Sequence, residues 1–544
     1  MRHKKQSNAN RGTVPGISAA GESPPDRPQA AIRPRAERAL IWGLCIFAAL
    51  RVLAYCAIFP FFNNVDEPYH FDLVVKYSHG EVPARLEPVS QESARYIILY
   101  GTPEYIHSPK EFPNGEIPPP TWTYPQSAIE QALPIALARW RSDINHEALE
   151  PPLYYALAGL WMKAGRACGL SGGYLLYWIR FLNPLLAGAL VWIGYMAAGL
   201  VFPGRLVPRL GVPALLAIFP QDMFYSIQSD VLSPVFFGLA FIGVLQWQKA
   251  DAPSVGLALF TGLALAAAGL TKGANWPLVA VALIFLLVRQ VRLAQSGNQS
   301  AKRFGSWRAI SVLCTAVLLP LGGWLARNAL VVGDATGSVQ KTKALGWTPK
   351  PLAHWLPHPI LTPSGLWEFW SGLLPSFWRG EFVWFNQRIA SPLMDDFYWL
   401  SSLVFLAVAV PALFASRRFG GGSARGLIPT GSRAGIGLAF ASFAAAVAFL
   451  AVTSMAFDYG KCVYPSRAHP FFTSGRLITG ALVPFLILYV YGIDRAFGFW
   501  KSDWPGLLVV AAVALLITVS EAELNSPALV SAYNWFGLWA GKSP

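Results

Sequence analysis

The chain has 544 residues, of which 54% are hydrophobic and only 13% are charged. This composition is too apolar for a soluble protein of this length and indicates a protein that crosses a membrane many times. The formal net charge of +14 does not indicate nucleic-acid binding, because the basic residues cluster in the N-terminal tail and a few short loops, where they set membrane orientation. The five cysteines include no CxxC pair, so neither a disulfide framework nor cysteine chemistry is expected.

The N-terminal part of the chain changes from a polar tail to an apolar span. Residues 1–38 are rich in Pro and Arg, and we interpret them as a disordered cytoplasmic tail rather than a cleavable signal. Residues 39–62 can cross a bilayer, which needs about 20 apolar residues. Arg51 interrupts this segment near its middle. A charge at that depth is costly, so Arg51 either forms a structural ion pair or helps to hold a buried anionic group.

The sequence Asp66-Glu67-Pro68-Tyr69-His70 lies where this first span emerges into water. Asp66 before Pro68 and an apolar run is also a helix-start pattern, in which the acid would cap the helix. A helix that begins here places His70 one turn from Asp66 and Glu67 on the same face. Two carboxylates and a histidine at a low-dielectric boundary form a candidate general base or metal site.

A polar stretch from about residue 63 to 150 separates this motif from the next apolar segments. Within it, Ile129, Leu133, Leu137 and Trp140 recur at helical spacing, so residues 126–142 are predicted to form a helix that lies on the membrane. The apolar segments that follow should be helices, because the backbone must satisfy its own hydrogen bonds in lipid. Nine of them contain no Asp, Glu, Lys or Arg: 183–204, 231–248, 254–271, 273–288, 309–326, 397–416, 434–457, 477–493 and 505–520.

The basic loops predict an orientation. Arg-rich and Lys-rich segments at 205–209, 289–308, 417–433 and 495–501 are assigned to the inside, together with the N-terminus. Two large loops, about 63–150 and 331–392, and a short C-terminal tail, 523–544, are then outside. An odd number of crossings is needed between residues 150 and 205, so either 151–168 or 174–203 is a partial helix, or the second breaks near Asn183-Pro184. We therefore expect an all-α polytopic membrane protein with about 11–13 spans in a transmembrane domain over residues 39–522.

Further candidate site residues map to the predicted outer face. Asp230 opens an apolar helix, where it is either an N-cap or a second acid. Lys272, flanked by Gly269, Thr271 and Gly273, is a third candidate cation on this face. Arg327 ends a span, where it either anchors the helix or binds a phosphate through its guanidinium. Asp334, between Gly333 and Gly337, predicts a tight turn. Arg476 follows Gly475 at the start of another span, a pattern that can bind an anion.

The order and spacing of these motifs resemble the C-type (GT-C) membrane glycosyltransferases and, within that class, the bacterial domain of unknown function family 2142. The resemblance covers roughly residues 40–500. It rests on Arg51 before the Asp66–His70 motif, an outer acid like Asp230, the Arg327–Asp334 element, Gly475-Arg476, and the Glu150-Pro151-Pro152-Leu153-Tyr154-Tyr155 element that opens the next helix. One departure is Ser229, since relatives often have Asn before the second acid.

The resemblance implies inverting sugar transfer from a polyprenyl-phosphate-linked donor to a cell-envelope glycan, lipid or protein acceptor, at the outer face of the inner membrane. Asp66 or Glu67 would deprotonate the acceptor, Arg327 and Arg476 would stabilise the leaving phosphate, and His70, Asp230, Asp334 and Arg51 would contact substrates. Relatives differ in metal use, so the cofactor is either a divalent ion, held by Asp66, Glu67 and His70, or none. The alternatives are a transporter or flippase, or a non-catalytic partner in polysaccharide export and assembly.

Overall fold

The computed structural model describes residues 34–140, 142–295, 300–411, 430–500 and 502–540. Most of the predicted N-terminal tail, residues 1–33, lies outside the described residues, and residues 34–38 belong to the first helix. From residue 41 onward, the described residues form one compact unit. The only strands among the described residues are two-residue antiparallel pairs: β1 (Glu87–Pro88) with β2 (Ile144–Asn145), β3 (Thr348–Pro349) with β6 (Phe457–Asp458), and β4 (Val383–Trp384) with β5 (Gln387–Arg388).

The protein is an all-α polytopic membrane protein, as the sequence predicts. Its α-helices are α1 (Pro34–Ile58), α2 (Glu67–His79), α3 (Gln91–Tyr100), α4 (Gln126–Trp140), α5 (Leu153–Ala167), α6 (Gly172–Arg180), α7 (Leu182–Val201), α8 (Leu206–Ala217), α9 (Ser233–Lys249), α10 (Val255–Thr271), α11 (Trp276–Gln295), α12 (Ser300–Val331), α13 (Ser338–Ala344), α14 (Pro363–Arg379), α15 (Pro392–Ala409), α17 (Thr430–Ala456), α18 (Leu482–Ala496), α19 (Trp504–Leu524), α20 (Ser526–Val530) and α21 (Trp535–Ala540). Short 3-10 turns important below are η5 (Asp222–Tyr225), η6 (Ser229–Leu232), η7 (Gly273–Asn275), η8 (Leu352–His354), η9 (Pro359–Leu361) and η11 (Gly475–Ala481).

Nine helical segments in the described part of the chain are long and apolar enough to cross a membrane. Two shorter apolar helices, α8 and α10, would bring the total to eleven, the lower end of the predicted range. The predicted ambiguity concerned residues 150–205, where the described residues contain one candidate span, Gly172–Val201, while α5 is not a candidate. The helix of this span is interrupted at Phe181, between α6 and α7, close to the predicted Asn183-Pro184, but its two parts count as one span. The next helix, α8, has only 12 residues, about 18 Å of helix.

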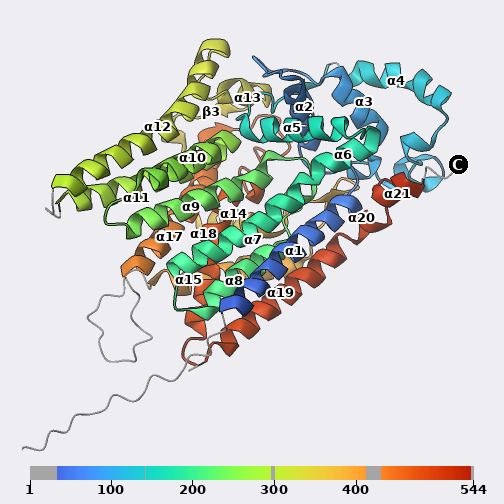
Figure 1. The fold of residues 1–544 in the computed structure, drawn as a ribbon. Helices are drawn as coiled ribbons and strands as arrows, with labels where there is room; N and C mark the ends of the chain where they lie inside the picture. The colour runs from blue at the N-terminus through green and yellow to red at the C-terminus, as the bar shows by residue number, and fades with distance from the viewer. Residues whose placement is uncertain (1–33, 141, 296–299, 412–429, 501, 541–544) are drawn as a thin grey trace, which may run out of the picture. The chain divides into compact units, whose positions relative to one another are not determined.

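The core of the helical unit is α18, whose side chains from Leu482 to Ile493 are all buried. A helix that is apolar all round belongs inside a bundle, and α18 packs against α8, α9, α15 and α17. Figure 1 shows α2, α3, α5 and α13 beside one end of the long helices. That end, called here the site end, also contains the turn η11 and the turns η6 and η7, both of which contact η11.

The segment predicted as a C-terminal tail is structured up to residue 540. Its last helix, α21, packs on the aromatic face of α6: the Trp535 and Tyr177 rings are 4.8 Å apart between centroids. Ser531 donates a hydrogen bond to Glu104 in the first large loop. The predicted helix over residues 126–142 is present as α4, which is mostly exposed.

Candidate active site

Charged side chains from distant parts of the chain converge at the site end of the bundle. Acids and bases alternate, so that each charge contacts an opposite one. The members are Asp66, His146, Glu147, Asp230, Lys272, Lys341, Glu381 and Arg476, called here the charged cluster. Asp66 and Arg476, which are 410 positions apart in sequence, form an ion pair at its centre.

Asp66 occupies the N-cap position of α2 in a left-handed backbone conformation, with φ at 64°. A non-glycine residue in this region is strained by about 1–3 kcal/mol. Its side chain makes no capping hydrogen bond. Instead its carboxylate accepts from Arg476 and contacts His146 Nε2 at 3.2 Å. The helix-cap interpretation therefore fails, and the Asp66 side chain belongs to the charged cluster.

The cluster controls the protonation of Asp66 and His146. Burial alone would raise the pKa of Asp66, but the Arg476 charge and the His146 hydrogen bond outweigh burial and hold the pKa well below its usual value. Burial would lower the pKa of His146, but its hydrogen bond to Asp66 and the charge of Glu147 outweigh burial and raise it. Asp66 is thus an ionised carboxylate at neutral pH.

Arg476 reaches the centre of the cluster because Gly475 lets η11 approach α14 closely. A Cβ at Gly475 would lie 2.1 Å from the backbone nitrogen of Phe377, so only glycine fits there. Beyond Asp66, the guanidinium donates to Gln228 Oε1 at 3.2 Å, and it lies 3.7 Å from Asp230 and 3.9 Å from Glu381. Three carboxylates therefore surround one arginine.

Asp230 and Lys272 form the second ion pair of the cluster. Lys272 Nζ donates to Asp230 Oδ2 at 2.6 Å, and both side chains are buried. Asp230 lies within η6 and faces Lys272 rather than capping α9, so its N-cap interpretation also fails. Its Oδ1 makes no hydrogen bond, although a buried carboxylate oxygen normally has a partner.

His70 lies beside the cluster, on the face of α2 that the sequence predicts. Its Nδ1 contacts the Tyr155 hydroxyl at 2.8 Å, and its Nε2, fully buried, has no hydrogen-bond partner. Burial first, and the nearby Lys272 charge second, lower the pKa of His70 to about 3. The ring is therefore neutral at physiological pH.

Glu67 has a different environment from the adjacent Asp66. Its carboxylate is fully buried and accepts from Arg180 Nη2 at 2.8 Å on both oxygens. The backbone N–H groups of Phe62 and Ile227 each donate to it at 2.9 Å. These bonds occupy the lone pairs of both oxygens. Glu67 therefore joins three segments of the chain, and its oxygens have no free position for a substrate proton or a metal ion.

The structure places the other three predicted site residues outside the charged cluster. Arg51 pairs with Glu521 of α19 and donates to the Phe219 carbonyl at 3.1 Å, which matches the structural ion-pair interpretation. Arg327 donates to the carbonyls of Val82 and Pro83 at 3.2 and 2.6 Å. Asp334 accepts from the N–H groups of Thr336 and Val339 in the predicted turn, where Gly333 and Gly337 both have positive φ.

Four members of the cluster were not predicted from the sequence. His146, Glu147 and Lys341 lie in the two large loops, and Glu381 follows α14. Lys341 joins the loops through bonds of 2.8 Å to Glu147 and 2.7 Å to Glu150. The adjacent pair His146-Glu147 shortly before the Glu150-Pro151-Pro152 element was the available signal.

A metal ion, if bound, has one candidate position among the described residues. Ligand atoms of Asp66, His146 and Glu147 all lie within 4.8 Å of one another. Nitrogen and oxygen ligands of this kind suit a divalent transition metal. This set replaces the predicted one, because Glu67 is occupied by Arg180 and His70 faces Tyr155. A cation here would compete with Lys341, which bonds both oxygens of Glu147, and would lie beside the positive charge of Arg476, which is paired with Asp66.

Comparison with known protein families agrees with the membrane architecture. A family model described as "Predicted membrane protein (DUF2142)" matches residues 50–463. The match covers more than half of the chain and includes Asp66, Asp230 and Lys272, and the chain belongs to this family. No curated protein matches the chain.

Proposed function

We propose that this member of the DUF2142 family is a membrane glycosyltransferase that moves a sugar from a polyprenyl-phosphate-linked donor to a hydroxyl of a cell-envelope acceptor. The observation that carries the proposal is the pairing of one carboxylate, Asp66, with Arg476 beside a second pair, Asp230 with Lys272. Such a site offers a proton acceptor and two cations within one cluster. Sugar transfer from a lipid phosphate requires both.

In the proposed reaction, Asp66 accepts the proton of the acceptor hydroxyl. The acceptor oxygen then forms a bond to the anomeric carbon from the face opposite the phosphate, and the bond between that carbon and the phosphate oxygen breaks. The phosphate leaves with the bonding electrons, and the configuration is inverted. Arg476 and Lys272 are the cations available to stabilise the leaving phosphate, and they replace the predicted combination of Arg327 and Arg476.

Donor binding would also activate the base. In the unliganded cluster, the guanidinium of Arg476 opposes the effect of burial on Asp66 and is the largest influence that lowers its pKa. A phosphate is a strong bidentate partner for arginine and would compete with Asp66 for the guanidinium. Asp66 would then lose this influence while remaining partly buried. Its pKa would rise, and its strength as a base would increase when the substrate is present.

The test compares cell-surface glycans by mass spectrometry from cells that express the wild type, Asp66→Asn, or no protein. Loss of a general base lowers the rate by about 10²–10⁴-fold. The Asp66→Asn strain should therefore lack the same glycan modification as the deletion strain. Asp251→Asn is the matched control, because it removes the same charge at an exposed position between α9 and α10 and should leave the modification intact.

Full modification by an Asp66→Asn variant that reaches the membrane in normal amounts would contradict the proposal. So would an accumulation of unflipped lipid-linked sugar in the deletion strain, with transfer still occurring once the lipid is supplied at the outer face. That second result would favour a transporter.

A further inference from the structure

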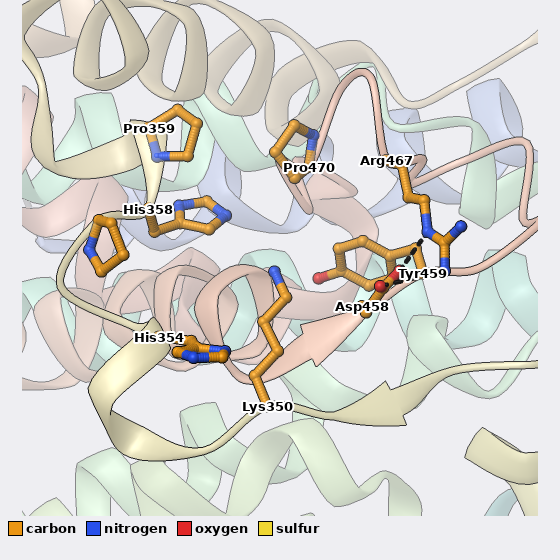
Figure 2. Close-up of a pocket in the computed structure, with 9 residues that line it drawn as sticks. Lys350, His354, His358, Pro359, Asp458, Tyr459, Arg467 and Pro470 are labelled. Atoms are coloured by element: carbon orange, nitrogen blue, oxygen red, sulfur yellow. Dashed lines mark hydrogen bonds and ion pairs between the residues drawn. The ribbon is translucent and has the colours of Figure 1, made fainter.

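A second polar feature lies apart from the charged cluster. It is a cleft of about 360 Å³ between the segment that follows β3 and the segment that follows β6 (Figure 2). The β3–β6 pair and a 2.7 Å bond from the Lys350 N–H to the Ala456 carbonyl hold the two segments together. We call this cleft the basic cleft. Its polar walls are formed by Lys350, His354, His358, Asp458, Tyr459 and Arg467.

Cationic and donor groups outnumber the one carboxylate of the basic cleft. Asp458 bonds Arg467 Nε at 2.7 Å and Nη2 at 3.1 Å, which leaves Nη1 of that guanidinium available. Figure 2 shows the Lys350 side chain extending into the space between His358 and Tyr459. Its ammonium makes no ion pair or hydrogen bond in the described part of the chain. The cleft therefore favours an anion.

His358 adds a neutral donor to this wall. Its Nδ1 accepts the N–H of Ile360 at 3.1 Å, so the proton of the neutral ring is on Nε2. The residue is 4% exposed. The backbone of Pro470 is an acceptor beside the ring, but Nε2 makes no hydrogen bond of ordinary geometry with it. A buried donor with a poorly aligned acceptor gains from an oxygen that a ligand supplies.

The cleft lies at the end of a membrane span. Asp458 comes two residues after Ala456, the last residue of the span Ser432–Ala456. The same segments carry exposed apolar side chains: Leu352 is 73% exposed, Leu356 79%, and Val463 93%. Large apolar side chains next to basic groups are typical of segments that insert into the headgroup region of a bilayer. The polar walls would then lie at the level of the lipid phosphates.

We propose that the basic cleft binds the phosphate group of a membrane lipid. Lys350 and Arg467 would contact the phosphate oxygens, His358 Nε2 would donate to one of them, and Leu352 and Leu356 would lie against the lipid chains. A soluble acidic glycan would satisfy the cations but would leave the leucines and Val463 in water, so the lipid is the better fit. This assignment is independent of sugar transfer at the charged cluster.

The test measures lipid binding to the full-length protein in detergent by native mass spectrometry. The probes are phosphatidylglycerol, a polyprenyl phosphate, inorganic phosphate and an acidic oligosaccharide. Lys350→Gln/Arg467→Gln should weaken binding of the lipid phosphate by about 30-fold, because each basic group near a membrane phosphate contributes about a factor of five. Lys343→Gln/Lys461→Gln is the matched control, since it removes the same charge from exposed positions outside the cleft.

The two lipids distinguish the source of the phosphate: preference for phosphatidylglycerol identifies a bulk phospholipid, and preference for the polyprenyl phosphate identifies a carrier lipid. Equal binding by the two double variants would overturn the proposal. Tighter binding of inorganic phosphate or of the oligosaccharide than of either lipid would also overturn it. The Lys350 ammonium has no bonded partner in the described residues and Arg467 is 68% exposed, so the variant should fold, which an unchanged circular dichroism spectrum would verify.

Discussion

Asp66 and Glu67 show how two adjacent carboxylates can have different roles. Asp66 is 19% exposed and shares its oxygens with Arg476 and His146, which a substrate could displace. Glu67 is fully enclosed by Arg180 and two backbone donors. The left-handed backbone at Asp66 turns the two side chains toward different partners. In the sequence the two acids look equivalent. Nothing in the sequence indicates that Arg180 contacts Glu67 and Arg476 contacts Asp66 in the folded chain.

Glu67→Gln should destabilise the protein rather than disable its chemistry alone. The substitution leaves the Arg180 guanidinium buried without its counter-ion, and breaking a buried pair in this way costs about 3–5 kcal/mol. We expect a clearly lower melting temperature for the purified variant in detergent. Glu368→Gln is the control, because its partner His469 is half exposed and exposed pairs contribute little. A wild-type melting temperature for Glu67→Gln would show that Glu67 is not part of the structural framework.

Asp222 predicts a specific pH dependence of stability. Burial, the largest cause, raises its pKa to about 7, although the Glu381 N–H donates to it at 2.9 Å. Between its ordinary value of 3.8 and about 7, the folded state holds a proton that the unfolded state has released. The free energy of unfolding therefore falls as pH rises through this window, by about 1.4 kcal/mol for each pH unit from this group.

Asp222→Asn removes that contribution. The measurement is the melting temperature of wild type and variant between pH 5 and 7, where the difference between them should grow with pH in favour of the variant. The pKa of Asp66 is lowered, so the change in unfolding free energy that its titration causes has the opposite sign and occurs below pH 5. The other titrating groups are common to both proteins. Parallel curves would show that Asp222 has an ordinary pKa.

Residues at the ends of spans were only partly predictable. Asp230 and Arg476 meet in the structure, as their shared face suggests, whereas Arg327 contacts Val82 and Pro83 instead. Helix topology predicts which side of the membrane a residue faces, but it does not predict lateral position within that side. His146 and Lys341 could not be ranked as candidate site residues. Both lie in the two large loops, whose sequences show no periodicity that indicates which residues are neighbours in space.

At the scale of elements, the length of an apolar segment predicts a helix well. The reason is that the backbone of such a segment must satisfy its own hydrogen bonds in lipid. All nine charge-free segments form helices in the described residues, and α5 begins at Leu153 directly after the Pro151-Pro152 pair. The departures have local causes. Residues 475–481 form the 3-10 turn η11 before α18 begins, because this turn is pressed against α14 at Gly475. The break between α6 and α7 at Phe181 places Arg180 against Glu67, a tertiary contact that no local pattern encodes.

At the scale of the whole molecule, the ion pairs fix which segments lie on the same side of the membrane. Asp66 contacts Arg476, and Asp230 contacts Lys272, so the turns before α2, α9, α11 and α18 must all lie on the same side of the membrane. The positive-inside pattern predicts that this side is the outside. One labelling experiment in each of two loops therefore tests the location of the entire charged cluster.

The test uses single cysteines in a variant without the five native ones. Lys110→Cys, exposed in the first large loop, should react with a membrane-impermeant maleimide in intact cells. Arg292→Cys, exposed near the end of α11 in a segment with Arg289 and Arg308, should react only after the cells are permeabilised, because short loops rich in Lys and Arg remain in the cytoplasm. The reverse pattern would place the charged cluster in the cytoplasm. Transfer from a donor displayed at the outer face would then be impossible, and the proposed function would need a donor lipid on the inner leaflet.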